Sequence, residues 1–194
     1  MTIGITGGIG SGKSFVARLL QQHFGIPVYD CDREARRLMN TSAELREALI
    51  ALIGSEAYSP DGLLNRPAVA RYLFESQEHA AAVNAVVHPA VRRDFLRWSS
   101  QQPSPVKALE SAILLESGFG DLADHILLVT APEELRLQRA MKRDSASAEQ
   151  VRSRMAQQTS EEARLAAADS VIINDGRPLL PQLTAVLKTL NTKL

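Results

Sequence analysis

The 194-residue chain has a single cysteine, Cys31, and no net formal charge, because 22 lysines and arginines balance 22 aspartates and glutamates. One cysteine excludes an internal disulfide framework and is typical of a reducing compartment. Balanced charge gives no general attraction to nucleic acid or to anionic membranes. The chain also lacks an apolar run of the ~18 residues that a membrane-spanning helix needs, and it lacks the pattern of a signal peptide. We therefore expect a cytoplasmic protein with no nucleic acid or membrane partner, and nothing in the composition indicates an obligate protein partner.

What the sequence does contain is an alternation of short apolar segments with amphipathic ones. Strands are expected at residues 3–6, 27–29, 106–110, 125–130 and 171–173. Helices are expected to begin near Lys13, Ala43, Arg66, Gln77, Pro132, Ala148 and Pro178. This alternation predicts an α/β fold in which helices cover both faces of a mainly parallel, five-stranded sheet.

Two segments interrupt the alternation. Residues 32–102 have a helical pattern without a strand, which predicts a helical insertion. Within it, "NRP" at residues 65–67 predicts the start of one helix. Residues 144–158 are polar, start at a Ser/Ala-rich hinge and suit a mobile lid. The nucleotide-binding core is then expected to comprise residues 1–31, 103–143 and 159–194.

The most specific local signal lies near the N-terminus, in "TGGIGSGKS" at residues 6–14. It satisfies G-x-x-x-x-G-K-[ST], the pattern of a phosphate-binding P-loop, whose glycines let backbone N–H groups turn onto phosphate oxygens. Lys13 is expected to reach the β- and γ-phosphates, and the Ser14 hydroxyl to ligate Mg²⁺. The predicted ATP site consists of Gly8, Gly10, Ser11, Gly12, Lys13, Ser14 and Phe15. An ordinary glycine turn is the alternative.

Three classes of P-loop protein compete for this signal. A GTPase switch normally carries D-x-x-G and N-K-x-D, and neither motif is present; the only asparagine after a late strand is Asn174, in "NDG". A motor or transporter ATPase carries an apolar strand that ends in a Mg²⁺-organising carboxylate, and "VKALE", ending at Glu110, is a poor match. A small-molecule kinase needs an acceptor-side base and lid arginines, and the chain has candidates for both.

The candidate base belongs to "VYDCD", residues 28–32. Asp30 and Asp32 follow the second predicted strand, at the carboxyl end where ligands bind in open parallel sheets. A carboxylate there can accept a hydroxyl proton during phosphoryl transfer. From the pattern alone, it is an equally good account that both aspartates are helix caps or solvated turn residues. Cys31, between them, is expected to be a small buried side chain.

The candidate lid arginines are Arg136, Arg139 and Arg143, which share one face of the helix expected from residue 132. Guanidinium groups suit a transferring phosphoryl group because they combine fixed donors with a permanent charge. The alternative is a solvated face whose arginines pair with neighbouring acidic residues. His88 is expected to end an apolar helix just before Pro89, and no second histidine or cysteine stands at metal-site spacing.

Taken in order along the chain, these motifs resemble the dephospho-coenzyme A kinase family over nearly the whole length. The resemblance rests on the P-loop, "YDCD", "LLNR" at 63–66, "VHP" at 87–89, "AILLESGF" at 112–119, "LQRAMKRD" at 137–144, Gln158 and "ADSVIIN" at 168–174. Three residues depart from the family's usual pattern: Phe15 stands in place of threonine, Cys31 in place of alanine, and Ala112 in place of proline. None of these changes removes a charged or nucleophilic group.

The resemblance implies a P-loop fold and transfer of phosphate from ATP, with Mg²⁺, to the ribose 3′-hydroxyl of dephospho-CoA. It implies that Asp32 is the base and that the lid brings Arg139 over the ATP. The helical insertion would receive dephospho-CoA. Further contacts in and near the acceptor pocket are expected from Thr6, Asp30, Arg66, His88 and Glu116.

Overall fold

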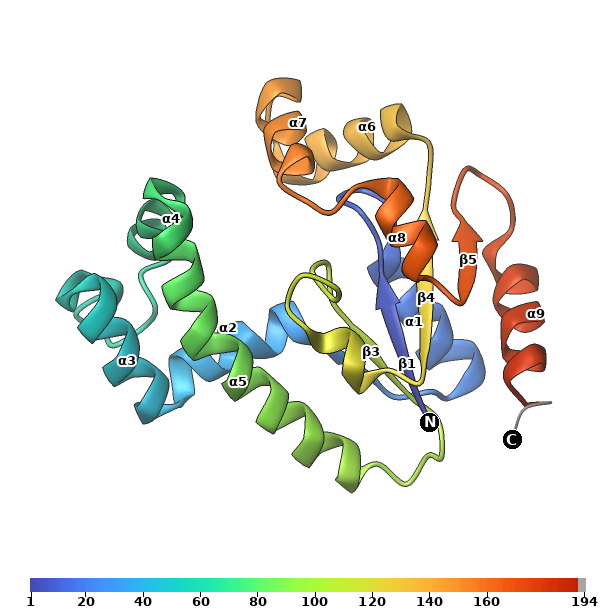
Figure 1. The fold of residues 1–194 in the computed structure, drawn as a ribbon, viewed down its shortest axis with the longest axis horizontal. Helices are drawn as coiled ribbons and strands as arrows, with labels where there is room; N and C mark the ends of the chain where they lie inside the picture. The colour runs from blue at the N-terminus through green and yellow to red at the C-terminus, as the bar shows by residue number, and fades with distance from the viewer. Residues whose placement is uncertain (192–194) are drawn as a thin grey trace. The chain divides into compact units, whose positions relative to one another are not determined.

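The computed structural model describes residues 1–191 and divides into two compact units. The first unit contains Met1–Asp30 and the chain from Gln102 onward, and the second is Cys31–Gln101. Figure 1 shows both units and labels most of their helices and strands.

The first unit is built on a five-stranded sheet. Its strands are β1 (Thr2–Thr6), β2 (Val28–Asp30), β3 (Lys107–Glu110), β4 (His125–Thr130) and β5 (Ser170–Ile173). They lie in the order β2-β3-β1-β4-β5, and every neighbouring pair is parallel. The parallel sheet expected from the sequence is thus confirmed. Because β1 is central, the loop that follows it lies between the carboxyl ends of β3 and β4, where open parallel sheets bind ligands.

One face of this sheet is covered by α1 (Lys13–Phe24) and α9 (Leu179–Asn191). Ile3 and Ile5 of β1 point into that layer, where Leu20 of α1 and Leu183 of α9 are also fully buried. Each such side chain contributes about 1.5–3 kcal/mol on burial. The helix α1 ends at Phe24 and is followed by Gly25, whose φ of 64° is in the left-handed region typical of a helix C-cap.

The other face of β1 carries Gly4 and approaches its neighbours too closely for a side chain. A Cβ on Gly4 would lie 2.8 Å from the Ala123 Cβ and 2.9 Å from the Leu114 Cδ2. Those residues belong to the segment that contains the short helix η2 (Phe119–Leu122), while α8 (Glu161–Ala167) packs on β4. Helical segments therefore cover this face too, as the predicted layer arrangement requires.

Two further helices of this unit, α6 (Glu133–Asp144) and α7 (Ala148–Ala156), form a hairpin. The connection turns at Ser145, which has a φ of 52°, and Ser147 then caps α7 in a capping box with Gln150. Val151 of α7 is buried against Leu137 and Ala140 of α6. The segment predicted as a lid is therefore folded onto α6, and its movement as a lid stays a prediction.

The second unit consists of helices, as the pattern of residues 32–102 predicts. They are α2 (Cys31–Thr41), α3 (Ala43–Ile53), the short η1 (Ser55–Ala57), α4 (Arg66–Glu75) and α5 (Gln77–Gln101). The long α5 packs against α2, α3 and α4. The predicted start of α4 is confirmed, because the Asn65 side chain accepts a hydrogen bond from the Ala68 N–H and Pro67 stands in the first turn.

One prediction for this unit is wrong. His88 does not end a helix, because α5 continues through Pro89 to Gln101. Proline is unfavourable in a helix interior because it lacks the N–H donor and crowds the preceding turn. Here the buried stripe on both sides of Pro89, which includes Val87 and Val91, outweighs that local cost. In the part of the chain that the structure describes, no helix has both the length and the apolarity to cross a membrane.

Candidate active site

The loop between β1 and α1 has the backbone conformation of a phosphate cradle. Gly10 and Gly12 have φ values of 77° and 93°, which side chains with a Cβ rarely adopt. The helix begins at Lys13 without a side-chain cap, and the Phe15 N–H donates to the Gly12 carbonyl at 2.9 Å. The positive end of the helix dipole therefore lies at the loop. This geometry can hold the phosphates of a nucleotide.

The helix α6 and the segment that follows β5 pack closely against the loop. A Cβ on Gly10 would lie 2.8 Å from the Arg136 Cα of α6, and a Cβ on Gly12 would collide with the side-chain amide of Asn174. The Ile9 N–H donates to the Gln158 Oε1 at 2.9 Å. The loop is therefore held by the segments after β4 and β5 as well as by its own glycines.

A cavity of about 240 Å³ opens beside the loop. It brings together the predicted phosphate-binding residues and two arginines of α6, and its lining is Gly10, Gly12, Lys13, Ser14, Phe15, Arg18, Arg139 and Arg143. Gly8 and Ser11 are buried behind it. Phe15 is 47% exposed, and the Arg18 guanidinium lies 5.6 Å from the centre of its ring. The structure thus places Lys13, Ser14 and Arg139 around one cavity.

Glu110 is a site residue that sequence reasoning missed. It is the last residue of β3, it is 6% exposed, and its Oε1 accepts a hydrogen bond of 2.5 Å from the Ser14 Oγ. In the sheet register Glu110 lies opposite Asp30 of β2. Its strand matched the pattern of a Mg²⁺-organising carboxylate poorly, but the sheet order puts it beside the serine of the P-loop. Only the pairing of β3 with β1 reveals this contact.

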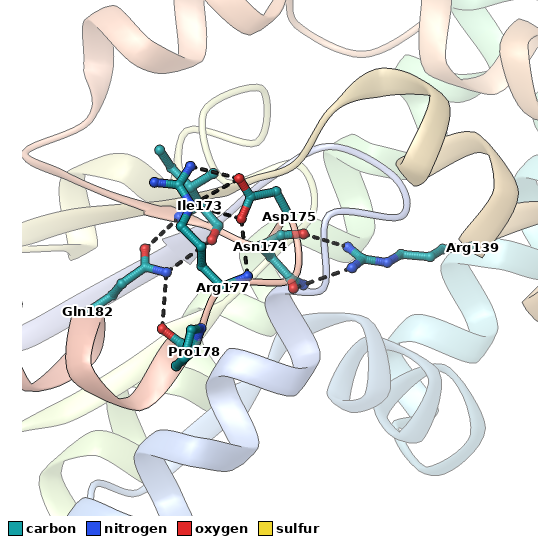
Figure 2. A network of polar contacts seen from close by, with 7 residues as sticks. All are labelled: Arg139, Ile173, Asn174, Asp175, Arg177, Pro178 and Gln182. Carbon is teal, nitrogen blue, oxygen red and sulfur yellow. Dashed lines mark hydrogen bonds and ion pairs between the residues drawn. The ribbon is translucent and has the colours of Figure 1, made fainter.

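The three arginines of α6 have different environments, although their spacing puts them on one face. Arg143 pairs with Asp144 at 2.7 Å, and this bond raises the pKa of Arg143. Arg139 donates instead to Asn174, as Figure 2 shows. Arg136 is 7% exposed and lies against Gly8. The prediction of a solvated, acid-paired face therefore describes only Arg143.

Arg136 belongs to a buried charged cluster behind the P-loop. Its Nη1 lies 3.9 Å from the Glu161 Oε2, which also accepts a hydrogen bond of 3.0 Å from the Arg164 Nη2. Burial raises the pKa of Glu161, but hydrogen bonds from Thr130 and Arg164 and the nearby positive charges lower it overall. The charge of Arg164 also lowers the pKa of Glu116, so the cluster places two guanidinium groups next to the phosphate loop with two carboxylates facing them.

The aspartate pair lies where β2 meets α2. Asp30 is the last residue of β2, and α2 begins at once with the buried Cys31, so that exposed Asp32 stands in its first turn. The chain thus passes from strand to helix at Cys31 without a loop. An acidic residue in a first turn is favourable to the helix dipole, so local structure alone accounts for Asp32. Its role as a base rests on the family resemblance.

The remaining predicted contacts lie in both units. Thr6 is buried at the end of β1, and the Glu116 Oε1 accepts a hydrogen bond of 3.0 Å from the Thr159 N–H. Burial raises the pKa of Glu116, but the hydrogen bonds from Thr159 lower it overall. In the helical unit Arg66 is exposed at the start of α4, and burial lowers the pKa of His88 within α5. The acceptor contacts expected of these residues stay predictions.

Comparison with known proteins agrees with this geometry. A family model described as dephospho-CoA kinase matches residues 1–179. A dephospho-CoA kinase from Bacteroides fragilis is 46% identical over 194 residues, which cover 99% of this chain and 94% of that protein. The crystal structure of TT1252 from Thermus thermophilus is 39% identical, with a TM-score of 0.84 and coverage of 100% of this chain and 97% of that one. A shikimate kinase from Acinetobacter baumannii shares the fold at 17% identity, with a TM-score of 0.58 over 99% of this chain and 93% of that one. The chain belongs to the dephospho-CoA kinase family.

Proposed function

We propose that this protein transfers the γ-phosphoryl group of ATP to the ribose 3′-hydroxyl of dephospho-CoA, giving coenzyme A and ADP in the last step of coenzyme A biosynthesis. The observation that carries the proposal is the cavity of Lys13, Ser14 and Arg139 in a chain that belongs to this family. The cytoplasmic location expected from the single cysteine is part of the same proposal.

On the ATP side, catalysis would consist mainly of positioning and charge neutralisation. The amides from Gly8 to Phe15 would hold the phosphates, and the Lys13 ammonium group would contact the negatively charged β- and γ-phosphate oxygens. Arg139 would stabilise the phosphoryl group as its bond to ADP breaks, because a fixed guanidinium needs little reorganisation at that moment. The buried charge of Arg136 and Arg164 would support the same loop from behind.

On the acceptor side, Asp32 would orient the 3′-hydroxyl and accept its proton during transfer. The helical unit would bind dephospho-CoA, with contacts from Arg66 and His88, while Thr6, Asp30 and Glu116 would contribute from the sheet unit. Residues 144–158 would act as a lid that excludes water from the reaction.

A magnesium ion fits the oxygen pair of Ser14 and Glu110. A hydroxyl and a carboxylate oxygen 2.5 Å apart are hard ligands of the kind that Mg²⁺ prefers, and Mg²⁺ in kinases usually takes only one or two protein ligands besides phosphates and water. Ser14 would bind the ion directly, and Glu110 would hold the serine hydroxyl in orientation. When bound, the ion would neutralise charge on the β- and γ-phosphates.

Replacing Glu110 with glutamine is expected to weaken Mg²⁺ binding about tenfold, the scale on which residues that orient metal ligands act. Glutamine keeps an oxygen for the Ser14 hydroxyl but removes the negative charge. Titration of Mg²⁺ into the protein with a fluorescent ATP analogue measures this binding without turnover. Glu162→Gln, at an exposed position on α8 of the same unit, serves as the control for loss of a carboxylate. An unchanged Mg²⁺ titration in Glu110→Gln would limit Glu110 to holding α1 against β3.

Release of ADP with and without dephospho-CoA tests the proposed activity. We expect ADP formation to depend on dephospho-CoA, and we expect shikimate and nucleoside monophosphates not to replace it. ADP formation at the same rate without any acceptor would reduce the protein to an ATPase. A faster reaction with another hydroxyl compound would show that the protein is a kinase with an acceptor other than dephospho-CoA.

A further inference from the structure

We propose that Asn174 is a positioning residue that holds Arg139 over the phosphate loop and ties that arginine to the loop itself. This inference rests on the role proposed for Arg139 in phosphoryl transfer. Asn174 directly follows β5 in "NDG", the asparagine that does not belong to a guanine-reading motif.

All four polar groups of Asn174 are engaged. Its backbone carbonyl and side-chain Oδ1 accept hydrogen bonds of 3.0 and 3.4 Å from the Nη1 and Nη2 of Arg139, as drawn in Figure 2. Its side-chain Nδ2 donates to the Ser11 carbonyl of the P-loop at 2.8 Å, and its backbone N–H donates to the Thr130 carbonyl of β4 at 2.8 Å. One residue therefore connects α6, the P-loop and the end of the sheet.

The residues on either side of Asn174 make polar contacts of their own. The Gln182 side chain of α9 accepts from the Ile173 N–H at 2.9 Å and donates to the Ile173 carbonyl at 3.0 Å, which fixes the residue just before it. On the other side Asp175 pairs with Arg177 at 2.7 Å, and this bond lowers the pKa of Asp175 to about 2. The negative charge of Asp175 is thus bound to Arg177, while Arg139 contacts only Asn174 in this loop (Figure 2).

The chemistry of an amide explains why asparagine suits this position. Only a side chain with both a donor and an acceptor can bond the Ser11 carbonyl and the Arg139 guanidinium at once. The amide is also uncharged, so it orients Arg139 without neutralising it. Arg143 and Arg136, by contrast, face the carboxylates of Asp144 and Glu161. Of the three arginines on α6, Arg139 is therefore the one that lines the phosphate cavity without a carboxylate partner among the residues that the structure describes.

Gly12 belongs to the same set of contacts. A Cβ at position 12 would collide with the Asn174 amide, so the close approach of that amide to the loop requires glycine there. Since the Ser11 carbonyl and Arg139 are both fixed by one side chain, the position of the arginine is coupled to the position of the P-loop. A guanidinium held in this way loses little freedom when it meets the transferring phosphoryl group.

A double-mutant cycle tests this inference. Asn174→Ala is expected to lower kcat by about 10²-fold, the scale of loss when a catalytic group is misplaced by about 1 Å. If Asn174 acts through Arg139, the double variant Asn174→Ala/Arg139→Ala is no slower than Arg139→Ala alone. Fold losses that multiply would show that Asn174 acts independently, and that would overturn the inference. Asp175→Ala, in the same loop, is expected to keep the wild-type kcat.

A second variant separates positioning from general stability. Asn174→Asp keeps an oxygen for Arg139, but it loses the donor for Ser11 and adds a negative charge facing the phosphates. We expect its kcat to fall at least as far as that of Asn174→Ala, and its KM for ATP to rise more. Better activity in the aspartate variant than in the alanine variant would indicate a structural contact only. Thermal melting of each variant shows that the comparison is made on folded protein.

The outcomes also separate this inference from the proposed function. Full activity of Arg139→Ala would overturn the role of Arg139, and the inference on Asn174 would fall with it. A slow Arg139→Ala enzyme combined with a wild-type Asn174→Ala enzyme would overturn the inference alone.

Discussion

Replacing Asp32 with asparagine is expected to lower kcat about 10²- to 10⁴-fold, the usual contribution of a general base. Asparagine has the same shape as aspartate but cannot accept the hydroxyl proton. ATP binding should change little, because the phosphate cradle is formed by β1, α1 and α6 and contains no part of α2. Steady-state turnover together with calorimetric titration of ATP gives both quantities.

The matched control for this variant is Glu34→Gln. Glu34 lies in the same first turn of α2, and its carboxylate pairs with Arg33 and Arg37 at 3.0 and 2.5 Å. Both substitutions remove one negative charge near the helix N-terminus, which costs about 0.3–1 kcal/mol of helix stabilisation. Only the Asp32 variant should lose turnover. A wild-type rate in Asp32→Asn would reduce Asp32 to a helix-stabilising residue.

Replacing Lys13 with methionine is expected to lower kcat/KM by about 10³-fold or more, near the upper end for loss of one preorganised electrostatic contact. Methionine keeps the length of the side chain but removes its charge from the cavity that also contains Arg139 and Arg143. Both ATP affinity and kcat should fall, because lysine would contact the β- and γ-phosphates in the ground state and in the transition state.

Two comparisons give the Lys13 result its meaning. Lys142→Met removes the same charge from an exposed position on α6 and should leave kcat/KM unchanged. Lys13→Arg keeps the charge but replaces a compact ammonium group with a planar fork that the tight loop does not match, so it should restore little activity. Near-normal activity in Lys13→Met would contradict the assignment of this cavity to ATP.

The features that the sequence predicted well are those whose geometry is local. The P-loop is defined by residues 7–14 and by the strand and helix on either side of it, so its motif alone located the phosphate site. Buried parallel strands are also recognisable in isolation, because apolar residues cover both of their faces. Asn65 and Pro67 predicted the start of α4 because a cap residue and a first-turn proline are also local signals.

The features that escaped prediction depend on contacts between distant segments. Glu110 meets Ser14 across 96 positions of the chain, and Asn174 meets Ser11 across 163, so neither contact leaves a spacing signal. The helix α2 begins directly after β2 without a loop, so no turn residues mark its start. Pro89 lies inside α5, so the pattern predicted that the helix stops there although it continues. The division of roles among the α6 arginines likewise depends on which carboxylate or carbonyl the fold brings to each one.

The most direct test of the proposed function is the position of the phosphate on the product. The protein would be incubated with ATP, Mg²⁺ and dephospho-CoA, and the product analysed by mass and by the coupling of phosphorus to the ribose protons. We predict one added phosphate at the ribose 3′-oxygen for each ADP released. Phosphate on another hydroxyl, or ADP release that leaves dephospho-CoA unmodified, would contradict the proposal.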